Sequence, residues 1–260
     1  MNRQVMMIAA LLAILVVAPA PGAFADGKVG VVLMHGKDST AKAKSPIGKL
    51  ANYLDGDFEV EAPDMPWSRS NGINKTLEES FKDIDAIVAD LKSDGATKIV
   101  VGGHSMGAAA ALAYATQRPG LAGVLMIAPG HRPDRQGRKN AAALDKAKAL
   151  IAAGNPEDDV DIQDINQGRS ISRTLDADIA VSWFDPDGLA VMQNAAAKLP
   201  EGTPVLFIIG EKDRLRATGE SLIFSKLPAH SNSAYTVVPG GHRVTPMKGK
   251  SEIADWLRRL

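Results

Sequence analysis

The sequence predicts an α/β fold: one doubly wound, mostly parallel sheet of about six strands, covered by helices. Continuously apolar runs, typical of strands buried on both faces, occur at 28–34, 99–101, 123–128 and 205–209, and a further strand is expected at 234–238. Helical patterns lie between most of these runs. This alternation favours a parallel sheet, because parallel strands need long crossover connections.

Length and composition are those of a single globular domain. The chain has 260 residues, of which 45% are hydrophobic and 23% charged, which suits one domain with a full core. It has 30 basic and 30 acidic residues and no basic stripe interleaved with aromatic residues, so we expect no nucleic-acid partner. It has no cysteine, which excludes disulfides and a cysteine-linked lipid anchor.

Residues 1–25 have the pattern of a secretory signal peptide. Arg3 precedes an apolar run at 5–18, and Ala23-Phe24-Ala25 stands before Asp26 as an A-x-A cleavage site. The run is shorter than the roughly 20 residues that span a bilayer, which disfavours a permanent anchor. We therefore expect cleavage after Ala25, a mature domain at 26–260, a periplasmic or secreted location, and no stable membrane insertion after cleavage.

The elements of the first hundred residues follow from local signals. Ser45-Pro46 opens a short helix, a strand is expected at 58–62, and it leads into the proline-rich loop 63–67. A capping box of Thr76 and Glu79 then begins a longer amphipathic helix. Near the other end of the chain, a terminal helix presents an apolar face of Ile253, Trp256, Leu257 and Leu260.

The stretch around Ser105 carries the clearest chemical signal. Gly103-His104-Ser105-Met106-Gly107 is a G-x-S-x-G between the expected strand at 99–101 and an alanine-rich helix at 108–117. A serine on so sharp a strand-to-helix turn has crowded neighbours, so the positions two before and two after it must be nearly free of side chain. The motif therefore predicts an exposed, nucleophilic serine.

This segment resembles the nucleophile elbow of the α/β-hydrolase superfamily, and the resemblance extends over most of the mature chain. The alternative is a glycine-rich turn of a nucleotide-binding fold with Ser105 as a helix cap. Neither G-x-G-x-x-G nor G-x-x-x-x-G-K-[ST] is present here, which argues against that alternative.

The resemblance assigns roles to further residues. His35-Gly36-Lys37 ends the first strand as an H-G-x, which implies an oxyanion hole made by the backbone N–H groups of Lys37 and Met106. His35 is expected to be a structural hydrogen-bonding residue, and the Lys37 ammonium to be solvated.

The same resemblance places the acid of a catalytic triad at Asp213 and its base at His242, each directly after an expected strand. Together with Ser105 they give the chain order Ser, Asp, His. A different topology would make Asp134, Asp185 or Asp187 the acid.

One departure from the superfamily pattern is expected: the leading antiparallel strands are missing, so the sheet should be trimmed. The stretch at about 131–187 should form a small cap over the site, as the resemblance implies. Within it we expect an alanine-rich helix at 139–153, a solvated acidic face at 157–164 without calcium-loop spacing, and a short strand or buried edge at 179–183. A small acyl pocket is expected from Trp67, Trp183 and Phe184 with Leu144 and Ile151, unless these residues only pack the cap on the sheet.

These features predict an exported serine hydrolase, a carboxylesterase for small-molecule esters with short or medium acyl groups. It would act through an acyl-serine intermediate and require no metal or organic cofactor. The same triad also serves a peptidase, a thioesterase or a cofactor-free haloperoxidase. A non-catalytic binding protein on this scaffold is the alternative from another class.

Overall fold

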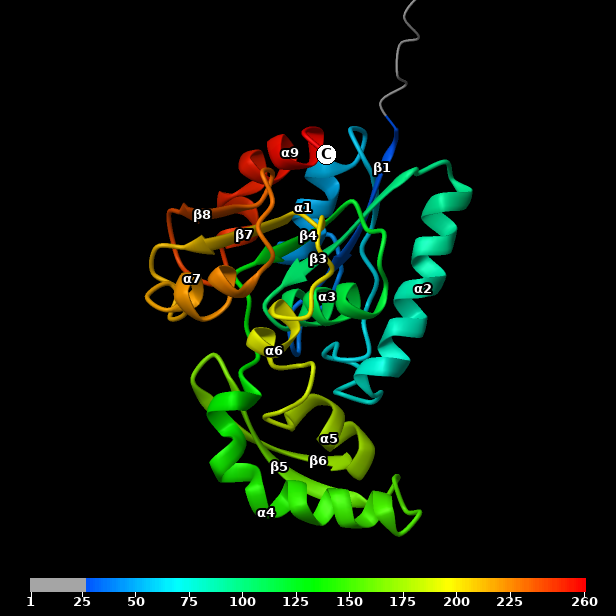
Figure 1. The fold of residues 1–260 in the computed structure, drawn as a ribbon, viewed down its shortest axis with the longest axis vertical. Helices are drawn as coiled ribbons and strands as arrows, with labels where there is room; N and C mark the ends of the chain where they lie inside the picture. The colour runs from blue at the N-terminus through cyan, green and yellow to red at the C-terminus, as the bar shows by residue number, and fades with distance from the viewer. Residues whose placement is uncertain (1–26) are drawn as a thin grey trace, which may run out of the picture.

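The computed structural model describes residues 27–260, so the expected signal peptide lies outside the described residues. A six-stranded sheet forms the centre of the molecule, with every neighbouring pair parallel and the order β2-β1-β3-β4-β7-β8 (Figure 1). Its strands are β1 (Val29–Met34), β2 (Glu59–Glu61), β3 (Lys98–His104), β4 (Gly123–Ile127), β7 (Val205–Gly210) and β8 (Ala234–Val238). The predicted parallel sheet of about six strands is confirmed.

Helices cover both faces of the sheet, as the term doubly wound requires. On one face α1 (Pro46–Leu54) and α9 (Lys250–Arg258) pack on side chains such as Val31 and Leu33 of β1. On the other face α2 (Leu77–Ser93) and α3 (Met106–Gln117) pack on the alternate residues Val32 and Met34. Successive residues of one strand therefore enter two separate cores, which explains the continuously apolar strand sequences.

The helix starts follow the sequence signals. Ser45 Oγ accepts a 3.0 Å hydrogen bond from the Gly48 backbone N–H, and Pro46 occupies the first turn of α1. Thr76 and Glu79 form both bonds of the expected capping box at α2. The remaining helices of the sheet region are short: α6 (Met192–Ala196), α7 (Gly219–Leu222), the 3-10 helix η1 (Phe224–Lys226) and α8 (Thr245–Lys248).

Residues 133–184, here called the cap segment, form a separate group of elements beyond one end of the sheet (Figure 1). Its elements are α4 (Pro133–Ala152), β5 (Asp159–Asn166), β6 (Arg169–Asp176) and α5 (Ala177–Phe184). β5 and β6 pair as an antiparallel hairpin whose two turn residues, Gln167 and Gly168, both have positive φ.

Of two expectations about the cap segment, one holds in part and one is wrong. In the stretch 157–164 the acidic residues Glu157, Asp158, Asp159 and Asp161 are exposed, as expected of a solvated face, but most of the stretch is a β-strand whose inner side buries Asp164 completely. The many aspartates hid a regular alternation in which Val160 and Ile162 face the core. Residues 179–183, expected as a strand or buried edge, lie in helix α5, which packs against α4.

The C-terminal helix lies as predicted. Ile253, Trp256 and Leu257 of α9 are fully buried, and Trp256 Nε1 donates a 2.7 Å hydrogen bond to the Asn232 carbonyl. Gly123 at the start of β4 makes room for this indole, since a Cβ there would stand 2.6 Å from the ring. Between residues 27 and 260, no helix has both the length and the apolar character needed to cross a membrane.

Candidate active site

Ser105 occupies a strained turn between β3 and α3. Its backbone has φ 57° and ψ −117°, a combination that few residues other than glycine adopt. A Cβ at Gly103 or at Gly107 would stand 2.6 Å from the carbonyl oxygen of Met34 in β1. The spacing of the G-x-S-x-G motif thus has a direct steric cause, because the turn and the neighbouring strand leave no room for side chains at these two positions.

Asp213 and His242 meet because the strands before them, β7 and β8, are parallel neighbours whose carboxyl ends lie at the same edge. His242 Nδ1–H donates a 2.7 Å hydrogen bond to Asp213 Oδ2, and the Leu215 backbone N–H donates a 2.8 Å bond to Oδ1. Burial alone would raise the pKa of Asp213, but these hydrogen bonds hold the pKa below its ordinary value. Asp213 is therefore a carboxylate that can orient and stabilise a protonated His242.

The alternative acids have other partners. Asp134 pairs with Arg132 at 2.6 Å, and Asp185 pairs with Lys148 at 2.9 Å. Asp187 is exposed. Of the four candidate carboxylates, Asp213 is the one bonded to His242.

Ser105 and His242 line one cavity of about 650 Å³ between the sheet and the cap segment, together with Asp213 and Gly130. Gly130 marks where the two side chains approach each other, because a Cβ there would stand 2.6 Å from Ser105 Oγ and 3.5 Å from His242 Cε1. No hydrogen bond joins Ser105 Oγ to His242 in the described part of the chain. Such catalytic bonds commonly tighten only when substrate is present.

Two backbone N–H groups border the same cavity. Lys37 and Met106 both line it, and within residues 27–260 neither N–H donates to a protein acceptor. The loop carrying Lys37 lies against Ser105, since a Cβ at Gly36 would stand 3.0 Å from Ser105 Cβ. Met106 begins α3, whose helix dipole adds positive potential at its N-terminus. Both backbone N–H groups that were expected to form an oxyanion hole thus lie beside Ser105 without an acceptor among residues 27–260.

The Lys37 side chain is buried, and the expectation that it is solvated is wrong. Its Nζ donates a 2.5 Å bond to Asp164 of β5, and Arg173 of β6 joins Asp164 at 2.7 Å and Asp38 at 2.6 Å. Asn166 donates to the same Asp38 oxygen at 2.9 Å. We call these five residues the Lys37–Asp164 cluster; it connects the loop after β1 to the hairpin of the cap segment.

Burial sets the electrostatics of this cluster. Burial lowers the pKa of Lys37. For Asp164, burial acts to raise the pKa, but the nearby Lys37 ammonium outweighs this effect and holds the pKa below its ordinary value. Removing one partner of such a buried pair costs about 3–5 kcal/mol, since the other charge stays buried without compensation. No local sequence pattern indicates this pairing, because Lys37 and Asp164 are 127 residues apart.

Three further histidines surround the site. His104 Nε2–H donates a 2.9 Å bond to the His242 carbonyl, and their ring centres are 4.7 Å apart, so His104 holds the loop of the expected base. His35 is buried and bonded through both ring nitrogens, donating to the Gly36 carbonyl and accepting from the Met65 N–H. It has the structural environment expected for it.

His131 was not singled out from the sequence. Its Nε2–H donates a 2.7 Å bond to the Trp183 carbonyl, whereas its buried Nδ1 has no hydrogen-bond partner among the described residues. Burial lowers the pKa of His104 and of His131 to about 3.

Trp67, Trp183 and Phe184 lie in the core and not on the wall of the cavity, which corrects the acyl pocket expected from them. Both indoles are fully buried and bonded to backbone carbonyls, Trp67 to His35 at 2.8 Å and Trp183 to Lys75 at 2.9 Å. The two indole rings contact each other edge to face at 5.4 Å. Leu144 is also buried, whereas Ile151 is exposed. The four buried residues pack the cap segment on the sheet.

The comparisons with known proteins identify the family. The sequence profile of the alpha/beta hydrolase family matches residues 31–255, which is most of the chain. The chain belongs to the alpha/beta hydrolase family. Its sequence has no significant match among curated proteins.

Solved structures of other alpha/beta hydrolases share the fold at low sequence identity. One of two metagenome-derived lipolytic enzymes has a TM-score of 0.62 at 18% identity, over 90% of this chain and 95% of the other. A monoacylglycerol lipase from Paleococcus ferrophilus has a TM-score of 0.62 at 22% identity, over 90% and 96%. A carboxyl esterase from Bacillus coagulans has a TM-score of 0.61 at 15% identity, over 90% and 89%.

Gly130 gives a test of the cavity geometry. Gly130→Ala places a methyl group 2.6 Å from Ser105 Oγ, so the hydroxyl must turn away from His242. We expect a fluorophosphonate to label Ser105 about a hundredfold more slowly, with little change in melting temperature. Gly241→Ala is the matched control, because its methyl group would have Lys212 at 3.9 Å and no closer neighbour. Equal labelling rates in the two variants would contradict this geometry.

The buried histidines predict a loss of stability in acid. The pKa of His104 and of His131 is about 3 in the fold and about 6.5 when unfolded, so between these values the unfolded chain binds more protons. The free energy of unfolding should therefore fall as the pH drops below 6.5, by on the order of 2 kcal/mol for each histidine at pH 5. Urea unfolding at pH 7.5 and pH 5 measures this. His104→Gln should lose about 2 kcal/mol less than wild type, and an identical loss would refute the assignment.

Proposed function

We propose that this protein is a serine hydrolase, a carboxylesterase that cleaves short or medium acyl esters through an acyl-serine intermediate. One observation carries the proposal: Ser105 lies on a strained turn and borders one cavity with His242, which is hydrogen-bonded to the ionised Asp213. The lipases and esterase of similar fold support ester chemistry, although at 15–22% identity they share no more than the fold.

In the first half-reaction, Ser105 Oγ attacks the ester carbonyl carbon while His242 Nε2 takes the hydroxyl proton. Asp213 accepts the hydrogen bond from Nδ1–H and stabilises the imidazolium that forms. The negative charge on the carbonyl oxygen is met by the N–H groups of Lys37 and Met106. The tetrahedral intermediate then collapses, the alcohol leaves with the proton from His242, and the acyl group remains on Ser105.

In the second half-reaction, water attacks the acyl carbonyl and His242 takes its proton. Collapse of the second tetrahedral intermediate returns that proton to Ser105 Oγ and releases the carboxylic acid. Each step uses the chain's own residues and water.

The cavity volume supports the choice of acyl size. About 650 Å³ is within the usual range for small-molecule sites and is shared between the acyl and alcohol parts of an ester. Its lining combines apolar residues such as Ile165 and Leu215 with polar ones such as Gln136, so a short acyl group finds apolar contacts without filling the whole space.

Substitution of the triad tests the proposal. Ser105→Ala and His242→Ala should lower kcat for 4-nitrophenyl butyrate by about 10⁶-fold, and Asp213→Asn by about 10⁴-fold, since the carboxylate orients the base but does not react. Asp185→Asn is the control, because Asp185 pairs with Lys148 and does not line the cavity. Retained turnover in folded Ser105→Ala would end the assignment. A wild-type optimum at long acyl chains, in a series of nitrophenyl esters, would refute the acyl size.

We also propose that residues 1–25 direct export and are removed, which leaves a periplasmic or secreted enzyme. The proposal rests on Arg3, the apolar run at 5–18 and the A-x-A motif that ends at Ala25. When the full chain with a C-terminal tag is produced in a bacterium, protein from the periplasm or medium should begin at Asp26. Ala25→Pro should block cleavage and leave the uncut chain with the membrane fraction. An uncut wild-type chain in the cytoplasm would contradict the proposal.

A further inference from the structure

Positively charged side chains predominate among the charged residues that line the cavity. Five cationic residues contribute to the lining and a single carboxylate, Asp213, which is bonded to His242. The cationic residues are Lys37, Arg132, Arg135, Lys212 and Arg214. The whole chain has equal numbers of basic and acidic residues, so this excess is local.

Two of the five cations are neutralised within the protein. Lys37 is paired with Asp164 in the buried cluster, and Arg132 with Asp134 through two hydrogen bonds. Lys212 is highly exposed and lies 3.9 Å from Glu211, a distance at which the pairing is weak.

Arg135 and Arg214 remain, and neither has a carboxylate at ion-pair distance within residues 27–260. Both are exposed at the mouth of the cavity, one from α4 and the other from the loop after β7. They therefore leave an excess positive charge where the substrate enters.

The fold makes space for the Arg214 guanidinium. A side chain at Gly168 would overlap with it, so the arginine lies against bare backbone at the turn of the β5–β6 hairpin. The positive φ of Gly168, 85°, independently favours glycine at this turn position. Arg214 thus extends from the sheet to the cap segment across one side of the mouth.

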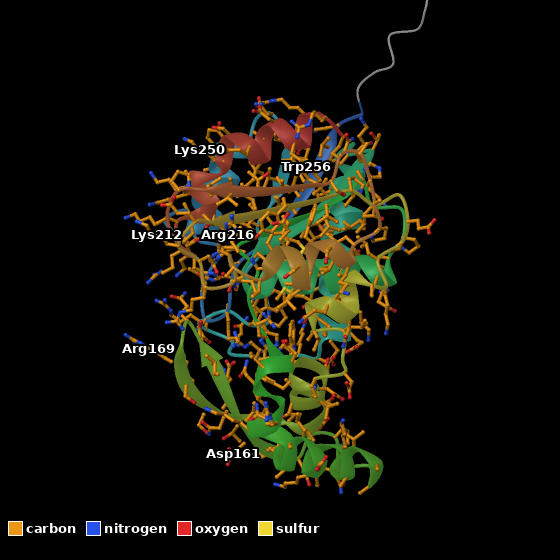
Figure 2. All side chains as sticks on the ribbon, turned by 60° about the vertical axis from the view of Figure 1, so that its left-hand side comes forward. Asp161, Arg169, Lys212, Arg216, Lys250 and Trp256 are labelled. Carbon is orange, nitrogen blue, oxygen red and sulfur yellow. The ribbon has the colours of Figure 1, made fainter. Side chains whose placement is uncertain are left out.

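Further positively charged side chains lie on the side of the molecule from which Lys212 projects. Figure 2 shows Lys212 and Arg216 projecting from the sheet region and Arg169 from the hairpin on the same side of the molecule, whereas Asp161 lies at the far end of the cap segment. Asp159 and Asp161 are exposed on β5 and do not line the cavity. The field at the mouth attracts anions and repels cations.

We propose that the natural substrate is an anionic ester, which carries a carboxylate, phosphate or sulfate that Arg135 and Arg214 bind while its carbonyl group lies at Ser105. This inference rests on the proposed function and names its substrate class. Guanidinium groups bind such oxyanions with two parallel hydrogen bonds, which also fixes the orientation of the ester. The two arginines are specificity-determining residues and take no part in the chemical steps.

Two pairs of esters of nearly equal shape test the effect of charge alone. Each pair has one anionic and one neutral member. For charge in the acyl part, the mono-4-nitrophenyl ester of adipic acid is compared with that of adipamic acid. For charge in the alcohol part, 4-(hexanoyloxy)benzoate is compared with 4-(hexanoyloxy)benzamide. Each kcat/KM is divided by the rate constant of hydroxide hydrolysis, which removes differences in intrinsic reactivity. In at least one pair the anionic ester should be favoured about tenfold at low salt, and the pair that responds identifies the charged end.

Salt and variants then assign the effect to the arginines. The preference should shrink as ionic strength rises from about 0.01 M to 0.5 M, because exposed charges are screened. Arg135→Gln and Arg214→Gln should each reduce the anionic-to-neutral ratio several-fold, and the double variant should bring it close to one. Arg138→Gln is the matched control: Arg138 is exposed on the same helix as Arg135 and does not line the cavity. Because the anionic-to-neutral ratio is compared, a variant that loses activity equally on both esters leaves the result unchanged.

These experiments distinguish failure of the anionic-substrate inference from failure of the proposed esterase function. Hydrolysis of all four esters with a ratio near one would overturn the anionic substrate and leave the esterase in place. If no ester is hydrolysed, calorimetric titration of Ser105→Ala with both pairs of esters decides the question without turnover. Tighter, salt-sensitive binding of the anionic member of at least one pair supports the inference, and equal binding within both pairs refutes it.

Discussion

The close approach of the α3 N-terminus to strands β1 and β3 is the constraint on which the rest of the site depends. Gly103 and Gly107 lie so near the Met34 carbonyl that any side chain at either position would displace the helix. The same contact sets the positive φ of Ser105 and brings the Met106 N–H beside the loop of Lys37. The candidate nucleophile Ser105 and both candidate oxyanion donors therefore depend on a single steric arrangement.

The sheet and the elbow were predictable because their signals are local. The strand sequences are apolar throughout, since adjacent residues enter opposite cores, and the G-x-S-x-G spacing reflects contacts within one turn and with β1. Asp213 and His242 were expected from the resemblance to the superfamily, and the structure pairs them because β7 and β8 are parallel neighbours whose carboxyl ends lie at one edge.

The cap segment was not predictable in the same way, because its structure depends on contacts distant in sequence. The aspartates of β5 indicate a solvated face until the partner strand and α4 bury the alternate residues. A lone lysine is ordinarily solvated, and the burial of Lys37 requires a carboxylate from this hairpin. An aromatic residue near a site can line the substrate pocket or pack in the core. Full burial and the hydrogen bonds to the His35 and Lys75 carbonyls place both tryptophans in the core.

The Lys37–Asp164 cluster has a mechanical consequence. The residue that anchors the hairpin through its ammonium also carries, on its backbone, one of the two N–H groups beside Ser105. Any lifting of the hairpin would pull on that residue or leave buried charges without partners, at a cost of about 3–5 kcal/mol. The width of the cavity entrance and the place of the Lys37 N–H beside Ser105 are thereby coupled through one residue.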